Sequence, residues 1–147
     1  MAKFGRASRE RLYTCRSPLI VLFEEVIKVF DCSILCGSRN REEQDALFYM
    51  DPPRTRCKWP DSSHNVEEGK EGEEALSMAV DAAPYYAEMP HTRWDEDSLR
   101  RWYYFGGRVV EMARHLSIPI RWGGDWDMDT YVLDQKLMDL PHFELIP

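Results

Sequence analysis

The chain has 147 residues, which is the size of one domain. Hydrophobic residues make up 44% of the chain and aromatic residues 12%, which excludes a disordered protein and allows a core without disulfide support. The 26 acidic residues outnumber the 19 basic ones and give a net charge of −7, so the balance favours neither a nucleic-acid-binding protein nor a polybasic membrane anchor.

The first predicted helix covers residues 17–30. Ser17 suits an N-cap, and Pro18 suits the first helical position. Apolar residues then recur at helical spacing, which indicates one buried stripe. The stripe consists of Leu19, Leu22, Phe23, Val26, Ile27 and Phe30. After this helix, the apolar run 32–36 predicts a strand that ends at Gly37.

A second helix is predicted over residues 40–50, with Asn40 as its cap and Glu43 completing a capping box. The prolines that follow end this helix, and residues 51–63 are rich in Pro, Ser and Asp, which predicts a loop. The acidic run 67–74 contains two glycines and predicts an exposed loop. The alternative for this run is a cation site made by its carboxylates.

The second half of the chain alternates strands with one long helix. Residues 78–83 predict a buried strand, and Asp95 is the candidate cap of a helix that runs to about residue 115. Gly106 and Gly107 lie in the middle of this helix and indicate a kink, a break or close packing. Two final strands are predicted over residues 118–122 and 142–146, and this mixture favours an α+β fold over a doubly wound sheet.

The start of the chain is basic but is not followed by an apolar segment, so we expect no secretory signal and synthesis in a cytoplasm. No apolar run approaches the roughly 18 residues of a membrane span. In a cytoplasm the four cysteines are expected to be reduced thiols that act as small hydrophobic residues. They are Cys15, Cys32, Cys36 and Cys57, and no second cysteine pair accompanies Cys32 and Cys36 to favour a zinc ribbon.

Three residues form a candidate metal site. His64 lies in a loop before the strand that carries Asp81, and His142 begins the last predicted strand. Two imidazoles and one carboxylate would suit a catalytic zinc, which keeps three protein ligands and an open position. Asp139 would then lie nearby as a carboxylate that can move a proton. The alternatives are a surface loop histidine at 64, a core histidine at 142 and a helix or turn cap at 139.

Five short motifs follow one another along the chain: Gly37-Ser38-Arg39 with Gln44, Ser62-Ser63-His64, Ala79-Val80-Asp81, Trp122-Gly123-Gly124-Asp125-Trp126 and Asp139-Leu140-Pro141-His142-Phe143-Glu144. Their order resembles the zinc peptidases of bacterial cell walls. This family comprises D-alanyl-D-alanine carboxypeptidases and dipeptidases together with phage L-alanyl-D-glutamate endopeptidases. The matching pieces span most of the chain and are individually weak but specific in combination.

The resemblance implies a small central antiparallel sheet with flanking helices, as in hedgehog-type zinc domains. It also implies a role for each matching residue. His64, Asp81 and His142 correspond to the ligands of Zn²⁺, and Asp139 corresponds to the general base. Arg39 corresponds to an arginine that stabilises the carbonyl oxygen or a peptide carboxylate; the alternative is a surface pair with Glu42 or Glu43. Residues that would contact the substrate or support the site are Ser62, Gln44, Trp122 and Glu144. A core position is the favoured alternative for Trp122.

One spacing departs from the family pattern. His64 and Asp81 are 17 residues apart, farther than is usual in the family. We interpret residues 65–77 as an acidic loop insertion within a single zinc peptidase domain that covers residues 1–147. The alternative is that His91, Cys57 or a carboxylate of the insertion replaces His64 as a ligand.

The resemblance therefore implies a phage endolysin. The expected activity is zinc-dependent hydrolysis of peptidoglycan stem peptides at the L-Ala–D-Glu bond, with a monomer made in the host cytoplasm and released to the cell wall for lysis. We expect no nucleic-acid partner and no stable membrane anchor. One alternative is a D-Ala-D-Ala carboxypeptidase, and another is a hedgehog-like zinc module that binds without cutting. The presence of Asp139 favours catalysis.

Overall fold

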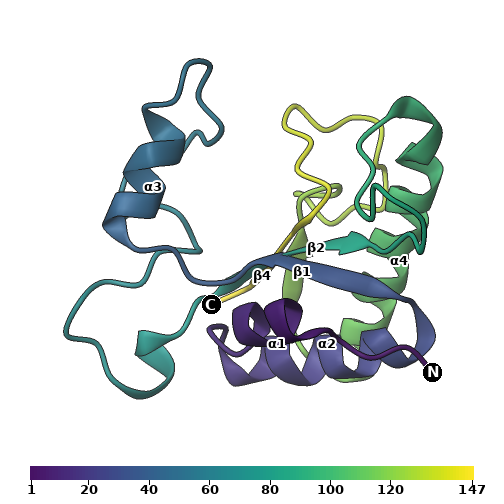
Figure 1. The fold of residues 1–147 in the computed structure, drawn as a ribbon, viewed down its shortest axis with the longest axis horizontal. Helices are drawn as coiled ribbons and strands as arrows, with labels where there is room; N and C mark the ends of the chain where they lie inside the picture. Colours follow the sequence, from purple (N-terminus) through teal and green to yellow (C-terminus); the bar gives the residue numbers. More distant parts are fainter.

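The computed structural model describes residues 1–147 and contains four α-helices, two short 3₁₀ helices and four strands (Figure 1). The helices are α1 (Arg6–Leu12), α2 (Ser17–Val29), α3 (Arg41–Phe48) and α4 (Leu99–His115), with 3₁₀ turns η1 (Gly72–Ala75) and η2 (Glu96–Ser98). The strands are β1 (Cys32–Cys36), β2 (Ala79–Pro84), β3 (Ile120–Trp122) and β4 (His142–Leu145).

The strands form one antiparallel sheet in the order β1-β2-β4-β3. The predicted α+β class and the small antiparallel sheet are therefore confirmed. Each predicted strand is present, with ends that differ by at most two residues. A register shift between Ile34 and Cys36 in β1 places Cys36 opposite Asp81 of β2.

The two faces of the sheet have different characters because side chains alternate along a strand. On one face Val80, Phe143 and Trp122 lie opposite one another on β2, β4 and β3. Phe23 of α2 and Phe105 of α4 pack edge-on against Phe143, with ring centroids 5.6 and 6.0 Å away. This face is the core, and the other face is left for polar side chains.

Helix α3 and its flanking loops lie beyond one end of the sheet, apart from the other three helices (Figure 1). The predicted capping box is present: the Asn40 side chain accepts from the Glu43 backbone N–H, and the Glu43 carboxylate accepts from the Asn40 N–H. The only fully buried residue of α3 is Gln44, so this helix is held by hydrogen bonds more than by apolar packing.

Two helix starts differ from the prediction. Helix α2 is preceded by Arg16 as the N-cap residue, and Ser17 is the first helical residue. The Ser17 N–H and hydroxyl both donate hydrogen bonds to the carboxylate of Glu73. The negative charge of Glu73 is stabilising there because the N-terminus is the positive end of the helix dipole. At α4, Asp95 precedes η2 instead of capping the α-helix, and Ser98 donates its hydroxyl to Asp95. The acidic run is therefore exposed, as predicted, but one of its carboxylates caps a distant helix.

The glycine pair in α4 marks close packing, because the helix continues without a break from Leu99 to His115. A Cβ on Gly106 would overlap the ring of Trp122, whereas a Cβ on Gly107 would meet nothing. We expect Gly106→Ala to lower the free energy of unfolding by about 1–3 kcal/mol through overpacking. The matched Gly107→Ala should be neutral or raise it by up to about 1 kcal/mol. Urea unfolding of both variants tests this, and equal effects would contradict it.

All four cysteines are free. Cys15 and Cys32 are buried, as expected of small hydrophobic residues, while Cys36 and Cys57 are partly exposed. None of the helices has the length and apolar character required to cross a bilayer.

Candidate active site and metal centre

The polar face of the sheet carries a row of three side chains. Asp81 lies directly between its cross-strand partners Cys36 on β1 and His142 on β4. Side chains directly opposite one another have Cβ atoms about 4.5–5.5 Å apart, so strand register alone brings these groups together. His64 joins them from a loop, which is held in place where the Arg39 N–H donates to the His64 carbonyl at 2.8 Å.

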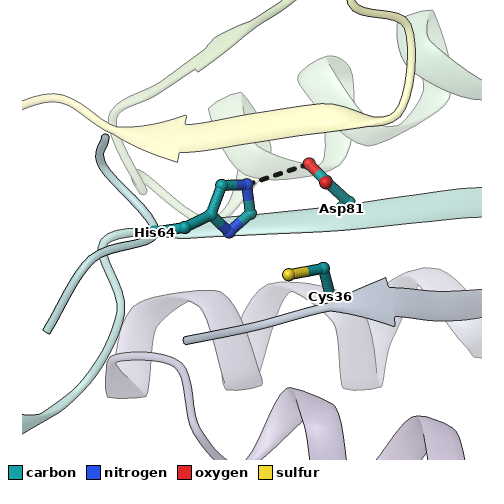
Figure 2. Close-up of side chains that lie close together, drawn as sticks. All are labelled: Cys36, His64 and Asp81. Atoms are coloured by element: carbon teal, nitrogen blue, oxygen red, sulfur yellow. Dashed lines mark hydrogen bonds and ion pairs between the residues drawn. The ribbon is translucent and has the colours of Figure 1, made fainter. Parts of the chain in front are cut away.

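Three donor atoms converge at this row. His64 Nε2 lies 3.0 Å from Asp81 Oδ1 and 3.2 Å from His142 Nδ1, and the last two atoms are 3.3 Å apart. Figure 2 shows the His64 ring directed at the Asp81 carboxylate. Ligands about 2.0–2.1 Å from a tetrahedral ion are separated by about 3.3 Å, so the spacing of this triangle fits such an ion.

The outer hydrogen bonds leave the correct lone pairs facing inward. His64 Nδ1 lies 2.7 Å from the Gly37 carbonyl, which can only accept, so Nδ1 carries the proton. His142 Nε2 lies 2.7 Å from the Glu144 carboxylate and is protonated for the same reason. The two inner nitrogens and Asp81 then present three lone pairs to one point. A cation, either a metal ion or a proton, is needed between them.

Cys36 offers a second donor set. Its Sγ and donor atoms of His64 and Asp81 all lie within 4.8 Å of one another (Figure 2). Burial raises the pKa of the Cys36 thiol, but the hydrogen bond and charge of His64 outweigh burial and lower it. The sequence interpretation treated Cys36 as a small hydrophobic residue. No pattern in the sequence places Cys36 at the site, because its position opposite Asp81 depends on an irregularity in strand register.

Metal uptake at the three converging donors is expected to release about one proton per ion near pH 7.5. Burial lowers the pKa of His64, but the charge and hydrogen bond of Asp81 outweigh it and raise this pKa to about 10 in the metal-free protein. His64 is therefore protonated near neutral pH and must lose that proton to bind a metal. Calorimetric titrations in buffers with different ionisation enthalpies measure the release. A binding heat that is the same in every buffer would contradict it.

The converging donors lie in a cleft of about 800 Å³. Residues 53–57 and 61–64 form one part of its wall, and Trp126 with residues 137–139 forms another part. Asp81, His142 and Glu144 of the sheet also line the cleft. Ser62 supports the cleft lining at residues 61–64. Its hydroxyl accepts a hydrogen bond from the His64 N–H at 3.3 Å, which fixes the turn before His64.

Arg39 faces the site and not the surface. Its guanidinium donates to Asp81 Oδ2 and to the Gln44 side-chain oxygen, each at 3.3 Å, and its side chain is 14% exposed. The alternative pairing with Glu42 or Glu43 is wrong, because Glu43 is engaged in the α3 capping box and Arg39 pairs with Asp81. Arg39 therefore brings a positive charge to the cleft beside the metal donors.

Gln44 is buried behind the cleft and connects its parts. Its side-chain oxygen accepts from Arg39 and from Asn65, and its nitrogen donates to the Cys57 carbonyl at 2.7 Å. Full burial leaves it no contact with a bound substrate. Gln44 therefore supports the site by fixing Arg39 and the loop that forms one wall.

Asp139 lies in the cleft with a carboxylate that makes no hydrogen bond and no ion pair. Burial, assisted by the negative charge of Asp81, raises the pKa of Asp139. Its backbone is fixed: the Asp139 N–H donates to the Gly123 carbonyl, and its own carbonyl accepts from the His142 N–H. A Cβ on Gly123 would overlap the Asp139 carbonyl, so this approach requires glycine. A free carboxylate held next to the donors is available to accept a proton.

Glu144 supports His142 from the same strand face, as its position two residues later predicts. Its hydrogen bond with His142 lowers the pKa of Glu144 to about 2, and Arg121 holds the second oxygen at 2.8 Å. The Ser63 hydroxyl donates to the same carboxylate at 3.3 Å. Glu144 is therefore ionised and fixes the orientation of the His142 ring.

Trp122 lies in the core, which is the position that the sequence favours for it, and not at the substrate. Trp122 is 4% exposed, stacks with Phe143 in the core and does not line the cleft. Its indole N–H donates to the Leu140 carbonyl at 2.8 Å, so it supports the turn between Asp139 and His142. Trp126 lines the cleft instead.

The alternative replacements for His64 lie elsewhere. His91 stacks on Tyr85 and bonds the Tyr86 carbonyl, and Glu73 of the acidic run caps α2. The Cys57 carbonyl is bound to Gln44, and its thiol is not among the converging donors. Despite the long segment between them, His64 and Asp81 are in contact.

Comparison with known proteins gives two similarities. The sequence profile of the family described as phage L-alanyl-D-glutamate peptidase matches residues 1–146. Among solved structures, the crystal structure of the Serratia marcescens L-Ala D-Glu endopeptidase ChiX aligns with a TM-score of 0.67 and 22% identity. The alignment covers 98% of this chain and 90% of that chain and shows a shared fold. No protein with a curated description matches.

Proposed function

Because this chain belongs to the phage L-alanyl-D-glutamate peptidase family, we propose that it hydrolyses the L-alanyl–D-glutamyl bond of peptidoglycan stem peptides with a zinc ion held by His64, Asp81 and His142. The family makes the chain a peptidase that acts on peptidoglycan. The proposal adds the scissile bond, the metal and the role of each residue. The observation that carries it is the convergence of three donor atoms 3.0–3.3 Å apart in a cleft that also holds the free carboxylate of Asp139.

Zinc suits this donor set because it prefers imidazole and carboxylate ligands, and when bound it would polarise the peptide carbonyl and lower the pKa of water toward about 7. The protein prepares both histidines for this task. The Gly37 carbonyl and the Glu144 carboxylate hold the outer ring protons, which keeps the inner nitrogens free.

In this proposal Asp139 is the general base. Its carboxylate has no competing partner, so it can accept a proton from the attacking water and later pass that proton to the leaving amino group. Its partial burial and the nearby negative charge of Asp81 raise its pKa, which makes it a better base than a solvent-exposed carboxylate.

Arg39 provides positive charge for the carbonyl oxygen as negative charge develops on it. The side chain is pre-positioned by Asp81 and by buried Gln44, so little reorganisation is needed during the reaction. Every proposed catalytic and ligand residue comes from one chain, so a monomer is sufficient. As a phage enzyme it would be made in the host cytoplasm and would act at the host cell wall after release.

Digestion of purified Gram-negative peptidoglycan tests the proposal. Mass spectrometry of the fragments should reveal new N-terminal D-Glu ends, which disappear with a chelator and return with zinc. Release of D-Ala alone would replace the proposal with a carboxypeptidase. No cleavage by a protein with stoichiometric metal would favour a binding module.

A further inference from the structure

Two arginines on the cleft wall have no protein partner. Arg54 and Arg56 line the cleft that holds His142 and Asp139, and both are exposed. Neither forms an ion pair, a side-chain hydrogen bond or a cation–π contact. In contrast, the Asp81 and Glu144 carboxylates in the cleft form ion pairs with Arg39 and Arg121, respectively.

The loop that carries the two arginines is anchored to α3. The Arg54 N–H donates to the Leu47 carbonyl at 3.0 Å. The Cys57 carbonyl and the Thr55 hydroxyl accept from buried Gln44 at 2.7 and 3.4 Å. These bonds fix the backbone on both sides of Arg56, so Arg54 and Arg56 belong to an anchored part of the cleft lining.

Gln44 also links this wall to the proposed catalytic arginine. The same amide group whose nitrogen holds residues 55–57 has its oxygen bonded to Arg39 at 3.3 Å. A ligand bound by Arg54 and Arg56 is therefore held on the framework that positions Arg39. Guanidinium groups bind carboxylates through paired, charge-assisted hydrogen bonds, so an anionic ligand fits this wall.

We infer that Arg54 and Arg56 are specificity-determining residues that bind the free carboxylate of the D-glutamyl residue next to the scissile bond. This inference rests on the proposed function. A glutamyl residue has two carboxyl groups, and the continuing peptide uses only one of them. The other remains a carboxylate on the residue whose amino group forms the scissile bond, and the two arginines line the cleft where that bond would be cut.

Two synthetic stem peptides test the inference. They differ only in whether this carboxyl group is a free carboxylate or a carboxamide. The wild-type enzyme should have a higher kcat/KM for the carboxylate peptide. In the Arg54→Gln/Arg56→Gln variant, kcat/KM for this peptide should fall about 10- to 100-fold, mainly through KM, while the value for the amide peptide changes little.

A control double variant removes two positive charges outside the cleft. Arg9 and Arg41 are exposed and lie outside the cleft, so Arg9→Gln/Arg41→Gln should leave the preference for the carboxylate peptide unchanged. Thermal unfolding of both double variants verifies that they are folded.

The outcomes separate this inference from the proposed function. If the wild-type enzyme cuts both peptides equally well, or if the cleft variant keeps the preference, the inference is wrong and the proposed function stands. If the zinc-loaded wild-type enzyme cuts neither peptide, the proposed function is wrong as well.

Discussion

An Asp139→Asn chain is expected to fold and bind metal normally but to hydrolyse the stem peptide about 10²- to 10⁴-fold more slowly in kcat. The amide has the shape of the carboxylate but cannot accept the proton from water. The fold should tolerate the change, because the Asp139 carboxylate makes no hydrogen bond or ion pair, and the contacts that hold the residue come from its backbone. Steady-state kinetics with metal content measured on the same samples provides the test.

Asp134→Asn is the matched control for this variant. Asp134 lies on the same segment between β3 and β4, is exposed and is not part of the cleft wall. It should retain the full rate. If Asp139→Asn also kept the full rate, Asp139 would not be the base. If Asp139→Asn lost its metal together with its activity, its role would be structural.

The second large effect is the loss of metal binding when His142 is replaced. It distinguishes a metal site that uses His142 from one that uses Cys36, because His64 and Asp81 belong to both. His142→Ala is expected to weaken metal binding more than about 100-fold and to abolish hydrolysis, because it removes one of the three converging donors. Cys36→Ser should retain one metal ion per chain and most of the activity. Equilibrium metal binding measured by mass spectrometry of dialysed protein distinguishes the two variants.

Cobalt substitution gives a readout that does not depend on activity. The wild-type protein loaded with Co²⁺ should lack the intense absorption of a thiolate–cobalt bond, because imidazole and carboxylate are the expected ligands. A thiolate–cobalt absorption band that disappears in Cys36→Ser would show that Cys36, His64 and Asp81 are the metal ligands instead. His115→Ala, at the exposed C-terminal end of α4, is the control for removal of a histidine.

Strong local patterns made most of the fold predictable from the sequence. The apolar stripe of α2, the capping box of α3 and the short apolar strands all have the predicted character. Helix α1 was missed because its sequence is largely polar, buries only Leu12 and lacks a side-chain cap. The contact between Glu73 and Ser17 was also missed, since a charged residue in an exposed run carries no local signal for a partner 56 residues away.

The candidate site was predictable where it depends on alternation along a strand. His142 and Glu144 share a face because side chains alternate along β4, whereas Asp81 joins them through the pairing of β2 with β4. The neighbours across the sheet were not predictable. The position of Cys36 beside Asp81 depends on a shift in strand register. The burial of Trp122 depends on α4, where Gly106 leaves room for the indole ring.

The long segment between His64 and Asp81 has a practical consequence for protein engineering. Its two ends are fixed by the sheet and by the contact with Arg39, while residues 67–74 are exposed and Gly69 lies in open space. Each doubling of a flexible loop costs only about 0.6 kcal/mol in closure entropy. The loop at Gly69, away from Glu73 and its contact with α2, is therefore the place to graft an affinity tag or a wall-targeting peptide without changing the distance between the two donor side chains.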